Sequence, residues 1–422
     1  MQSVRFVPHL RRGIESLFSG GGKAYRHGTH RSVTPEETLA RVAPLFPKAG
    51  ITRVANITGL DRVGIPVVAV CRPNSRSLSV SQGKGVTLAA AKASGVMEAL
   101  ELYHAENIGL PLLWGTRRDL ACGRALVDTS RLMPARRSPF HDDYAILWIE
   151  SRCLVGGDPV WVPFETVHTN ACWPEPAGSG CFACTSNGLA SGNHRLEAIC
   201  HAIGEVVERD AVTLWRRRGN TSATRLDLDT VDDPGCRALV QQFERAGLGV
   251  LVWNVTSDIG IAAFLCAAFE RSLDPALAMF TSNGSGCHPD RCVALSRAIT
   301  EAAQSRLTLI AGSRDDLEQS MYREPREAER LMASFQFELA SRGGVPFHSV
   351  PHRDHAGFDE DVAWQLARLR SAGFERVLCV DLGQDNRIAV LRVIVPGLEG
   401  CDEVADYVSG PRARAAEDAC SR

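Results

Sequence analysis

Two pairs of glutamates have the spacing of residues that share one face of a helix. Glu98 and Glu101 are three positions apart, and so are Glu205 and Glu208. Side chains three or four residues apart on a helix are neighbours, so each pair would point in one direction. Carboxylates from two helices that converge would repel one another unless cations held them. The spacing therefore predicts a cation site wherever these two helices meet.

Arginines and further acids extend this pattern. Arg209 lies four residues after Glu205, and Arg297 lies four residues before Glu301, while Glu197 precedes Glu205 by eight. Mg²⁺ takes oxygen ligands and usually brings phosphates with it. Arginine forks suit the remaining phosphate oxygens as bidentate donors. Spacing alone thus suggests a Mg-nucleotide site that is built without a P-loop.

The competing interpretation is a set of solvated helix faces, because acids at such spacing often form surface ion pairs that contribute little. The neighbouring residues argue against it. Small or apolar side chains flank the acids, among them Ala99, Leu100, Ile203, Val206 and Val207, and few lysines are available to neutralise them. We therefore favour an enclosed site over a surface one.

Three long helices must carry these residues, and we expect them at about 87–106, 195–217 and 290–311. The first is rich in Ala, Leu, Met and Glu and contains no proline. A shorter helix should begin after Thr34, with Thr34 as its N-cap, Pro35 at its first position and Glu37 completing a capping box.

Strands are expected between the helices. Runs rich in β-branched residues occupy 51–57 and 65–70, and further strands are expected at 250–255 and 261–268. Segments 376–382 and 387–395 flank the turn residues of 383–386 and predict a hairpin. The mixture is α+β without a steady βαβ rhythm.

Familiar nucleotide and metal motifs do not fit. Gly83-Lys84-Gly85 and Gly22-Lys23-Ala24 both lack the remaining P-loop residues, and no G-x-G-x-x-G follows an expected strand. The pair Cys181 and Cys184 forms a lone C-x-x-C, whereas zinc sites usually combine two clusters. Buried or incidental thiols explain this pair better than a metal does.

Composition narrows the remaining classes. The 422 residues carry 47 basic and 49 acidic side chains, so nothing at the whole-chain level indicates nucleic acid or an anionic membrane as a partner. Residues 1–12 lack the apolar region of a signal peptide, and no apolar run approaches the ~20 residues of a membrane span. The fourteen scattered cysteines fit free thiols in a reducing compartment. We expect a cytoplasmic protein.

Several long motifs, in order, resemble the YcaO family. Segment 94–101 is similar to its S-x-x-x-E-x-x-E motif, and segment 186–211 to its S-N-G-x-x-x-G-N…E-A…E-x-x-E-R-D-A core. Segment 297–306 matches its R-A-x-x-E-A-x-Q-S-R helix. Segments 50–53, 58–61 and 395–399 also look like family signatures, so the resemblance runs from about Lys23 to Glu399.

The resemblance implies one YcaO domain at 23–400, between an irregular segment 1–22 and a C-terminal tail 401–422. It implies antiparallel sheets packed with helices, and an ATP site formed between helices. The implied metal ligands are Glu98, Glu101, Glu205 and Glu208. The implied ATP-binding residues are Asn193, Glu197, Arg209, Arg297, Glu301 and, as the family's N-terminal lysine, Lys23. Lys84 is a second lysine that could reach a phosphate or else lie on the surface.

The chemistry that the resemblance implies is activation of a backbone amide in a peptide or protein substrate. A nucleophile adds to the carbonyl, ATP phosphorylates the oxygen, and the oxygen leaves as phosphate. A Cys, Ser or Thr side chain of the substrate would give an azoline, and external sulfide would give a thioamide. The chain ends without the Pro-rich tail of many azoline-forming members and lacks their fused recruiting domain. This favours thioamide formation with a TfuA-type partner.

Two alternatives stay open. The chain could be an azoline-forming cyclodehydratase of a ribosomally made peptide, or an ATP-binding accessory protein for modification of a ribosomal protein. Substrate-dependent phosphate release would separate an enzyme from an accessory protein. The resemblance also implies a homodimer, and it leaves the catalytic base unassigned.

Overall fold

A computed structural model of the chain describes residues 21–219, 222–271, 281–316, 335, 343–403 and 407–420. The expected irregular segment 1–22 lies almost wholly outside these residues, and the expected tail 401–422 lies partly outside them.

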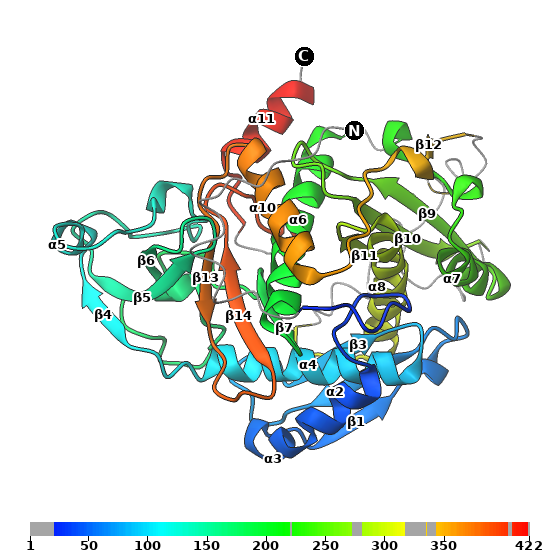
Figure 1. Ribbon diagram of the computed structural model, residues 1–422, viewed down its shortest axis with the longest axis horizontal. Helices are drawn as coiled ribbons and strands as arrows, with labels where there is room; N and C mark the ends of the chain where they lie inside the picture. Colours follow the sequence, from blue (N-terminus) through cyan, green and yellow to red (C-terminus); the bar gives the residue numbers. More distant parts are fainter. Residues whose placement is uncertain are drawn as a thin grey trace.

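Helices surround and separate small antiparallel sheets (Figure 1). The helices are α2 (Pro35–Val42), α3 (Phe46–Ala49), α4 (Leu88–Glu106), α5 (Arg117–Ala121), α6 (Arg195–Arg218), α7 (Pro234–Arg245), α8 (Arg291–Ala311), α10 (Phe358–Ser371) and α11 (Pro411–Cys420). The strands are β1 (Arg53–Asn56), β2 (Val67–Cys71), β3 (Val80–Lys84), β4 (Leu112–Gly115), β5 (Ile146–Cys153), β6 (Pro159–Pro163), β7 (Leu189–Gly192), β8 (Leu226–Asp227), β9 (Leu248–Asn254), β10 (Ala263–Glu270), β11 (Ser282–Cys287), β12 (Val345–Pro346), β13 (Leu378–Asp381) and β14 (Ala389–Ile394).

The three long helices α4, α6 and α8 match the sequence expectation to within one residue at each end. Their boundaries have local causes. The side chains of Thr87 and Asp290 accept hydrogen bonds from the first turns of α4 and α8. Gly219 and Gly312 end α6 and α8 in the left-handed conformation that glycine tolerates best. The capping box of Thr34 and Glu37 at α2 is also confirmed.

Two three-stranded sheets each support one of the long helices. The antiparallel sheet β1-β2-β3 packs against α4, and the antiparallel sheet β11-β10-β9 packs against α8. Glycines permit the close approach, because a Cβ on Gly83 of β3 would meet the backbone of Ala91 and Gly95 in α4. Gly284 and Gly286 of β11 have the same relation to the backbone of α8.

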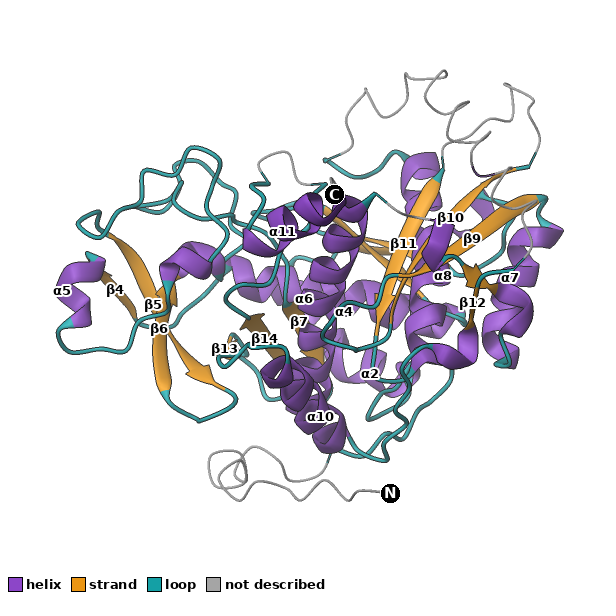
Figure 2. Ribbon diagram, turned by 90° about the horizontal axis from the view of Figure 1, so that it is seen from above, coloured by secondary structure: helices purple, strands orange, loops and turns teal. Residues whose placement is uncertain are grey.

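A six-stranded antiparallel sheet forms the other side of the molecule. Its order is β4-β5-β13-β14-β7, with β6 paired to β5, and it contains the expected hairpin as β13 and β14. In Figure 1 helix α6 stands between this sheet and the β9–β11 sheet, and Figure 2 shows the same separation from above. The expected α+β class with antiparallel sheets is confirmed. The short pair β8 and β12, which is parallel, is an addition to it.

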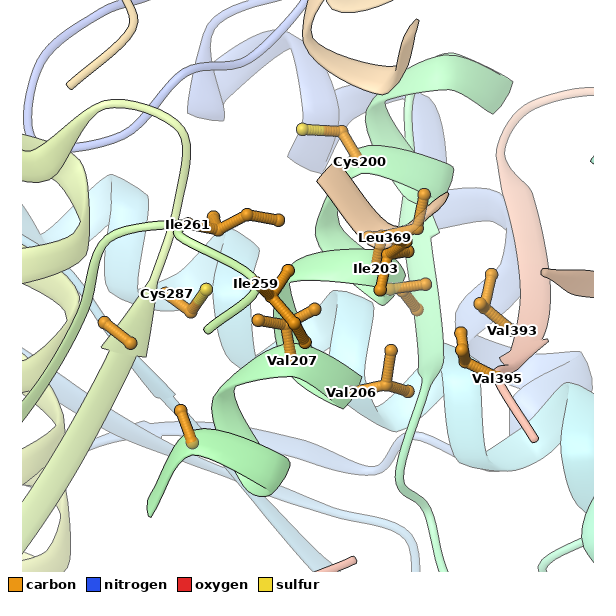
Figure 3. Packing of buried hydrophobic residues seen from close by; sticks show 14 of the residues in the cluster. Cys200, Ile203, Val206, Val207, Ile259, Ile261, Cys287, Leu369, Val393 and Val395 are labelled. Atoms are coloured by element: carbon orange, nitrogen blue, oxygen red, sulfur yellow. The ribbon is translucent and has the colours of Figure 1, made fainter. Parts of the chain in front are cut away.

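The buried face of α6 anchors the central core. Ile203, Val206 and Val207 pack against Ile259 and other apolar residues from the loop before β10, from α10 and from the end of β14 (Figure 3). Most of the side chains of α6 are buried, which ordinarily suits apolar residues. The acids of this helix must therefore face something other than open solvent. Among the described residues, no helix is both long and apolar enough to cross a membrane.

Candidate ATP and magnesium site

A cavity of about 840 Å³ opens where α4, α6 and α8 meet. Its wall includes every residue that the sequence placed at metal or nucleotide except Lys23. These are Glu98 and Glu101 from α4, Glu197, Glu205, Glu208 and Arg209 from α6, Arg297 and Glu301 from α8, and Asn193 from the turn before α6. The three helices thus bring together acids that are up to about two hundred positions apart in sequence.

Backbone and hydroxyl donors orient the acids of α4 and α6. Glu101 accepts hydrogen bonds from the backbone N–H and the hydroxyl of Ser191, at 2.8 and 2.6 Å. Glu205 accepts one from the backbone N–H of Gly188 at 3.1 Å. Both donors lie on or next to β7, whose path past the two helices is fixed by its pairing with β14. The edge of the sheet therefore fixes the positions of these two carboxylates.

Burial raises the pKa of the two acids on α4. The pKa of Glu98 rises to about 7, and that of Glu101 to about 8, because burial disfavours the charged form and nearby carboxylates add repulsion. Burial also raises the pKa of Glu205, and Glu208 contributes to that rise. The positively charged side chains of the protein do not offset the effect of burial on these carboxylates.

Glu208 has one oxygen bonded and one free. Its Oε1 accepts a hydrogen bond from the hydroxyl of Ser285 at 2.7 Å. Its Oε2 is buried and has no hydrogen-bond partner among the described residues. A buried carboxylate oxygen without a partner is costly, so a cation is the group that best fits this position.

Glu301 lies in the opposite electrostatic environment. Burial alone would raise its pKa, but Lys84 and Arg209 outweigh this effect and lower the pKa to about 2. Its carboxylate forms an ion pair with Lys84 and accepts a hydrogen bond from the backbone of Ser285 at 3.3 Å. Lys84 is partly buried and lines the cavity, so it is placed as a site residue rather than as a surface lysine.

Two further polar groups, on residues that line the cavity, are not satisfied. The side-chain oxygen of Asn193 and Nε of Arg297 are both buried and lack hydrogen-bond partners among the described residues. The remaining guanidinium edge of Arg297 lies 3.2 Å from Nδ1 of His201. Burial and the neighbouring Arg297 lower the pKa of His201 well below its usual value, so this imidazole is neutral. An acceptor such as a phosphate oxygen would satisfy Arg297.

The structure does not bring Lys23 to this cavity. Its ammonium group is buried in an ion pair of 2.6 Å with Asp361 at the start of α10, and it donates to the carbonyl of His355 at 3.0 Å. A buried ammonium requires such a partner. Instead, the following residues of the same segment reach the site: Ser32 donates two hydrogen bonds to Glu197, at 2.9 and 2.7 Å, and Arg31 lies 3.6 Å from it.

Arg392 of β14 is a neighbour of the site that sequence reasoning missed. It is 3% exposed, and two of its nitrogens have no partner among the described residues. Burial lowers its pKa to about 10, although Glu205 and Cys184 oppose this shift. The available signal was a single charge inside the otherwise apolar run 389–394. Ser285 was missed as well, because nothing in the Gly-Ser-Gly run of β11 distinguishes a ligand-orienting serine from a turn.

The donor set fits magnesium with ATP. Carboxylate oxygens are the ligands that Mg²⁺ prefers, and Mg²⁺ usually completes its shell with water and phosphate. The four glutamates line the cavity but do not form one tight cluster. Among the described residues, the groups of His, Cys, Asp and Glu whose ligand atoms lie within 4.8 Å of one another involve other side chains. Such spacing leaves room for phosphates between the acids. Cys181 and Cys184 are not part of those groups either.

Comparison with known proteins indicates the same two ligands, ATP and Mg²⁺. A family model described as YcaO cyclodehydratase, ATP- and Mg²⁺-binding, matches residues 82–399. An uncharacterised protein encoded in the tfuA 3′ region of Rhizobium leguminosarum bv. trifolii is 38% identical over 87% of this chain and 88% of its own length. An uncharacterised protein of Methanothermobacter thermautotrophicus is 34% identical over 87% of this chain and 95% of its own.

Solved structures share the fold. The YcaO protein of Methanopyrus kandleri bound with AMPPCP and Mg²⁺ superposes with a TM-score of 0.73 at 24% identity, over 92% of this chain and 99% of that one. A heterocyclase in complex with substrate and cofactor gives a TM-score of 0.72 at 23% identity, and this chain spans 55% of its length. The chain belongs to the YcaO family, the ATP-dependent and Mg²⁺-binding enzymes that modify backbone amides.

Proposed function

We propose that this enzyme converts a backbone amide of a peptide or protein into a thioamide, with sulfide supplied through a TfuA-type partner. The cavity carries the amide-activating part of the proposal, because acids from three helices and Arg209, Arg297 and Lys84 converge there. The relative encoded beside tfuA supports the sulfur chemistry.

The reaction balances with ATP as the phosphoryl donor. Hydrosulfide adds to the amide carbon, the carbonyl oxygen takes the terminal phosphoryl group of ATP, and the oxygen then leaves as phosphate. The products are the thioamide, ADP and phosphate. When bound, Mg²⁺ would neutralise the charge on the phosphoryl group during its transfer.

Residues of the chain are assigned by their positions in the cavity. We assign Glu98, Glu101, Glu205 and Glu208 to the metal ions. Asn193, Glu197, Arg209, Arg297 and Glu301 are assigned to the nucleotide. Arg209 is held by Glu208 at 3.6 Å and by the hydroxyl of Ser285 at 3.3 Å, so its charge is fixed in direction. Such preorganised charge stabilises a transition state without reorganisation during the reaction. Lys84 replaces Lys23 as the lysine that we place near a phosphate.

Calorimetry provides the first test of the site. We expect ATP to bind the unmodified chain when Mg²⁺ is present, and binding to be lost in Glu205→Gln, because that carboxylate lines the cavity and interacts electrostatically with Glu98, Glu101 and Glu208. Glu417→Gln on α11, whose carboxylate does not line the cavity, serves as the control and should bind normally. Equal affinity in Glu205→Gln and the unmodified chain would remove Glu205 from the metal assignment.

A second experiment identifies the product. The enzyme, a TfuA-type protein, sulfide, ATP and a candidate peptide are incubated together, and phosphate release and peptide mass are followed. Replacement of oxygen by sulfur in the peptide supports the proposal. Loss of water without sulfide would instead identify an azoline-forming enzyme. If the chain binds ATP but releases no phosphate with any of the substrates that related enzymes modify, an accessory role would be favoured.

A further inference from the structure

One edge of the β9–β11 sheet runs along the cavity. In this sheet β11 occupies the end position, and among the described strands it pairs with β10 alone. Thr281, Ser282 and Asn283 line the cavity, and Ser285 further along the strand orients Glu208. The end strand of a sheet presents backbone N–H and C=O groups to which another strand can bind. The structure therefore places a free strand edge beside the acids of the proposed reaction site.

The pairing of β11 with β10 shows which residues present these groups. The backbone N–H of His288 donates to the carbonyl of Ala262 at 3.1 Å, and these two residues continue the register of the two strands. Residues that face each other in an antiparallel pair alternate between hydrogen-bonded and non-hydrogen-bonded pairs. The even-numbered residues of β11 thus bond to β10. The backbone groups of Asn283, Ser285 and Cys287 point away from it, towards the free edge.

A contact of Ser285 agrees with this direction. Its backbone N–H donates to Oε1 of Glu301 at 3.3 Å, so the outward groups of β11 face residues of the site. Asn283 presents the same kind of groups two residues earlier, and it is exposed whereas the other residues of β11 are buried. Among the described residues, no strand pairs with this side of Asn283. The position is consequently open to a ligand that pairs with the backbone.

Asn283 lies on the opposite side of the acids from the start of α6, where several of the nucleotide residues are assigned. Helix α6 runs antiparallel to β11, because a Cβ on Gly204 would lie 3.2 Å from the carbonyl oxygen of Cys287, whereas Glu208, about one turn later, bonds Ser285. The path along β11 from Cys287 to Asn283 therefore leads away from the start of α6. A ligand at Asn283 would approach the acids from the side opposite to those nucleotide residues.

The chemistry of this edge favours a peptide backbone over an anion. Asn283 offers an N–H donor and a C=O acceptor side by side, and a residue of an extended peptide offers the complementary pair. A phosphate oxygen would be repelled by the carbonyl oxygen, because both carry negative charge. Addition of a strand to a free sheet edge is a recurring mode of peptide recognition, in which main-chain hydrogen bonds supply the affinity.

We propose that the peptide substrate binds as a short added strand on the free edge of β11 and exchanges backbone hydrogen bonds with Asn283. This inference rests on the proposed function, because it locates the substrate of that reaction. Residues two apart on a strand are separated by roughly 6.6–6.8 Å, so the next amides of the added strand reach the level of Ser285. Glu208 and Glu301 are held there. The substrate class is thus a chain that is extended around the modified amide and has a free N–H at the paired residue.

Peptide binding tests this proposal without prior identification of the natural substrate. The probe is a set of short randomised peptides with a fluorescent label, and fluorescence anisotropy follows its binding to the full chain. A second set carries a methyl group on every backbone nitrogen. We expect saturable binding of the first set and at least about tenfold weaker binding of the methylated set, because the backbone donors are lost. The proposal is overturned if the unmodified chain shows no saturable binding, or if it binds both sets equally.

Two substitutions at one position separate the backbone from the side chain. Asn283→Pro removes the outward N–H but no hydrogen bond to β10, and proline is tolerated at such edge positions. Asn283→Ala removes the carboxamide and keeps the N–H. We expect Asn283→Pro to bind the unmethylated peptides at least about tenfold more weakly than Asn283→Ala does. Equal peptide binding by the two variants would contradict the proposal.

Calorimetry with ATP and Mg²⁺ on the same proteins keeps the two proposals apart. Both variants should retain ATP binding, because the nucleotide residues at the start of α6 lie on the other side of the acids. Absence of ATP binding by the unmodified chain would count against the proposed function, whereas normal ATP binding without peptide binding would count against the edge of β11. If Asn283→Pro does not fold, the comparison of the two peptide sets decides.

Discussion

Glu208 shows most clearly how a single residue can be unfavourable for folding and necessary for binding. One of its oxygens is buried without a hydrogen-bond partner among the described residues, while the other is held by Ser285. Although Arg209 lies 3.6 Å from the bonded oxygen, the second oxygen is a cost to the fold that a glutamine amide would lessen, whereas loss of the ligand charge weakens the site. The two effects can be separated by experiment.

The variant Glu208→Gln is expected to unfold at the same or a higher urea concentration than the unmodified chain when Mg²⁺ is absent. Its ATP turnover should fall by about two orders of magnitude or more, because a charge that faces the phosphates is lost. Urea unfolding and phosphate release measure the two properties. A variant that is strongly destabilised yet turns over ATP normally would place Glu208 in the structural core instead.

The acids of α4 make magnesium binding depend on pH. Because the pKa of Glu98 is raised to about 7 and that of Glu101 to about 8, both retain protons near neutrality in the absence of cations. Magnesium must displace these protons, so its affinity should rise as the pH increases from about 6 to 9. Calorimetry in buffers of different ionisation enthalpy should reveal proton release. An affinity that does not change over this range would contradict the assignment.

The same groups affect stability in the opposite direction. An acid whose pKa is higher in the folded state than the usual 4.5 destabilises the fold increasingly as the pH rises. The cation-free chain should therefore lose stability between about pH 4.5 and pH 8 through these two groups, and Mg²⁺ should restore it. The two pH profiles, with and without Mg²⁺, are expected to diverge above neutrality.

At the scale of elements, close contacts between sheets and helices fix the depth of the cavity. Gly284 on β11 lies directly against the backbone of α8, near Ala298 and Ala302, and Gly83 on β3 has the same relation to α4. Each glycine allows a strand to approach a helix that carries site residues. Any added side chain would force the strand and the helix apart.

The substitution Gly284→Ala should destabilise the fold by about 1–3 kcal/mol, because its Cβ would collide with backbone that cannot move aside. It should also weaken ATP binding by displacing Arg297 and Glu301. Gly59→Ala, where nothing lies within 4 Å of the new Cβ, is the control and should change neither property. Urea denaturation and calorimetry provide the readouts. Unaltered stability in Gly284→Ala would contradict the close packing.

The elements were predictable to different degrees from sequence. The long helices have strong caps, such as Thr87 and Asp290, and uninterrupted helix-forming composition, so their ends could be located closely. Strands β4 to β6 were not anticipated, and of these β6 both begins and ends with a proline, which is unusual within a strand. The acids of the site could be placed from helical spacing. Lys23 could not, because its partner Asp361 is distant in sequence and nothing local indicates that pairing.

On the scale of the whole molecule, the C-terminal helix α11 is tied to the helix that carries most of the site. Arg412 bonds both oxygens of Asp210, at 2.9 Å each, and also reaches Asp258 at 2.5 Å. Asp210 is fully buried and directly follows Arg209. Burial raises the pKa of Asp210 while the Arg412 guanidinium opposes that rise. This single arginine therefore keeps a buried charge compensated beside the cavity.

Replacing Arg412 with alanine should lower the free energy of unfolding by about 3–5 kcal/mol. This is the usual effect of removing one partner of a buried ion pair and leaving the other charge uncompensated. Arg414→Ala on the same helix, whose arginine contacts a backbone carbonyl at an exposed position, should cost far less. Denaturant unfolding at neutral pH distinguishes them. Similar losses in both variants would mean that helix docking, rather than compensation of Asp210, provides the stability.

The ion pair of Lys23 and Asp361 joins two segments that are synthesised at very different times. Residue 23 leaves the ribosome early, yet its partner is synthesised more than three hundred residues later. The segment that supplies Arg31 and Ser32 to Glu197 therefore cannot be anchored during most of translation. Contacts of such long range form slowly, since they must await loop closure. A nascent or truncated chain that stops before α10 should consequently bind nucleotide more weakly than the full chain, because the segment that contacts Glu197 lacks its anchor.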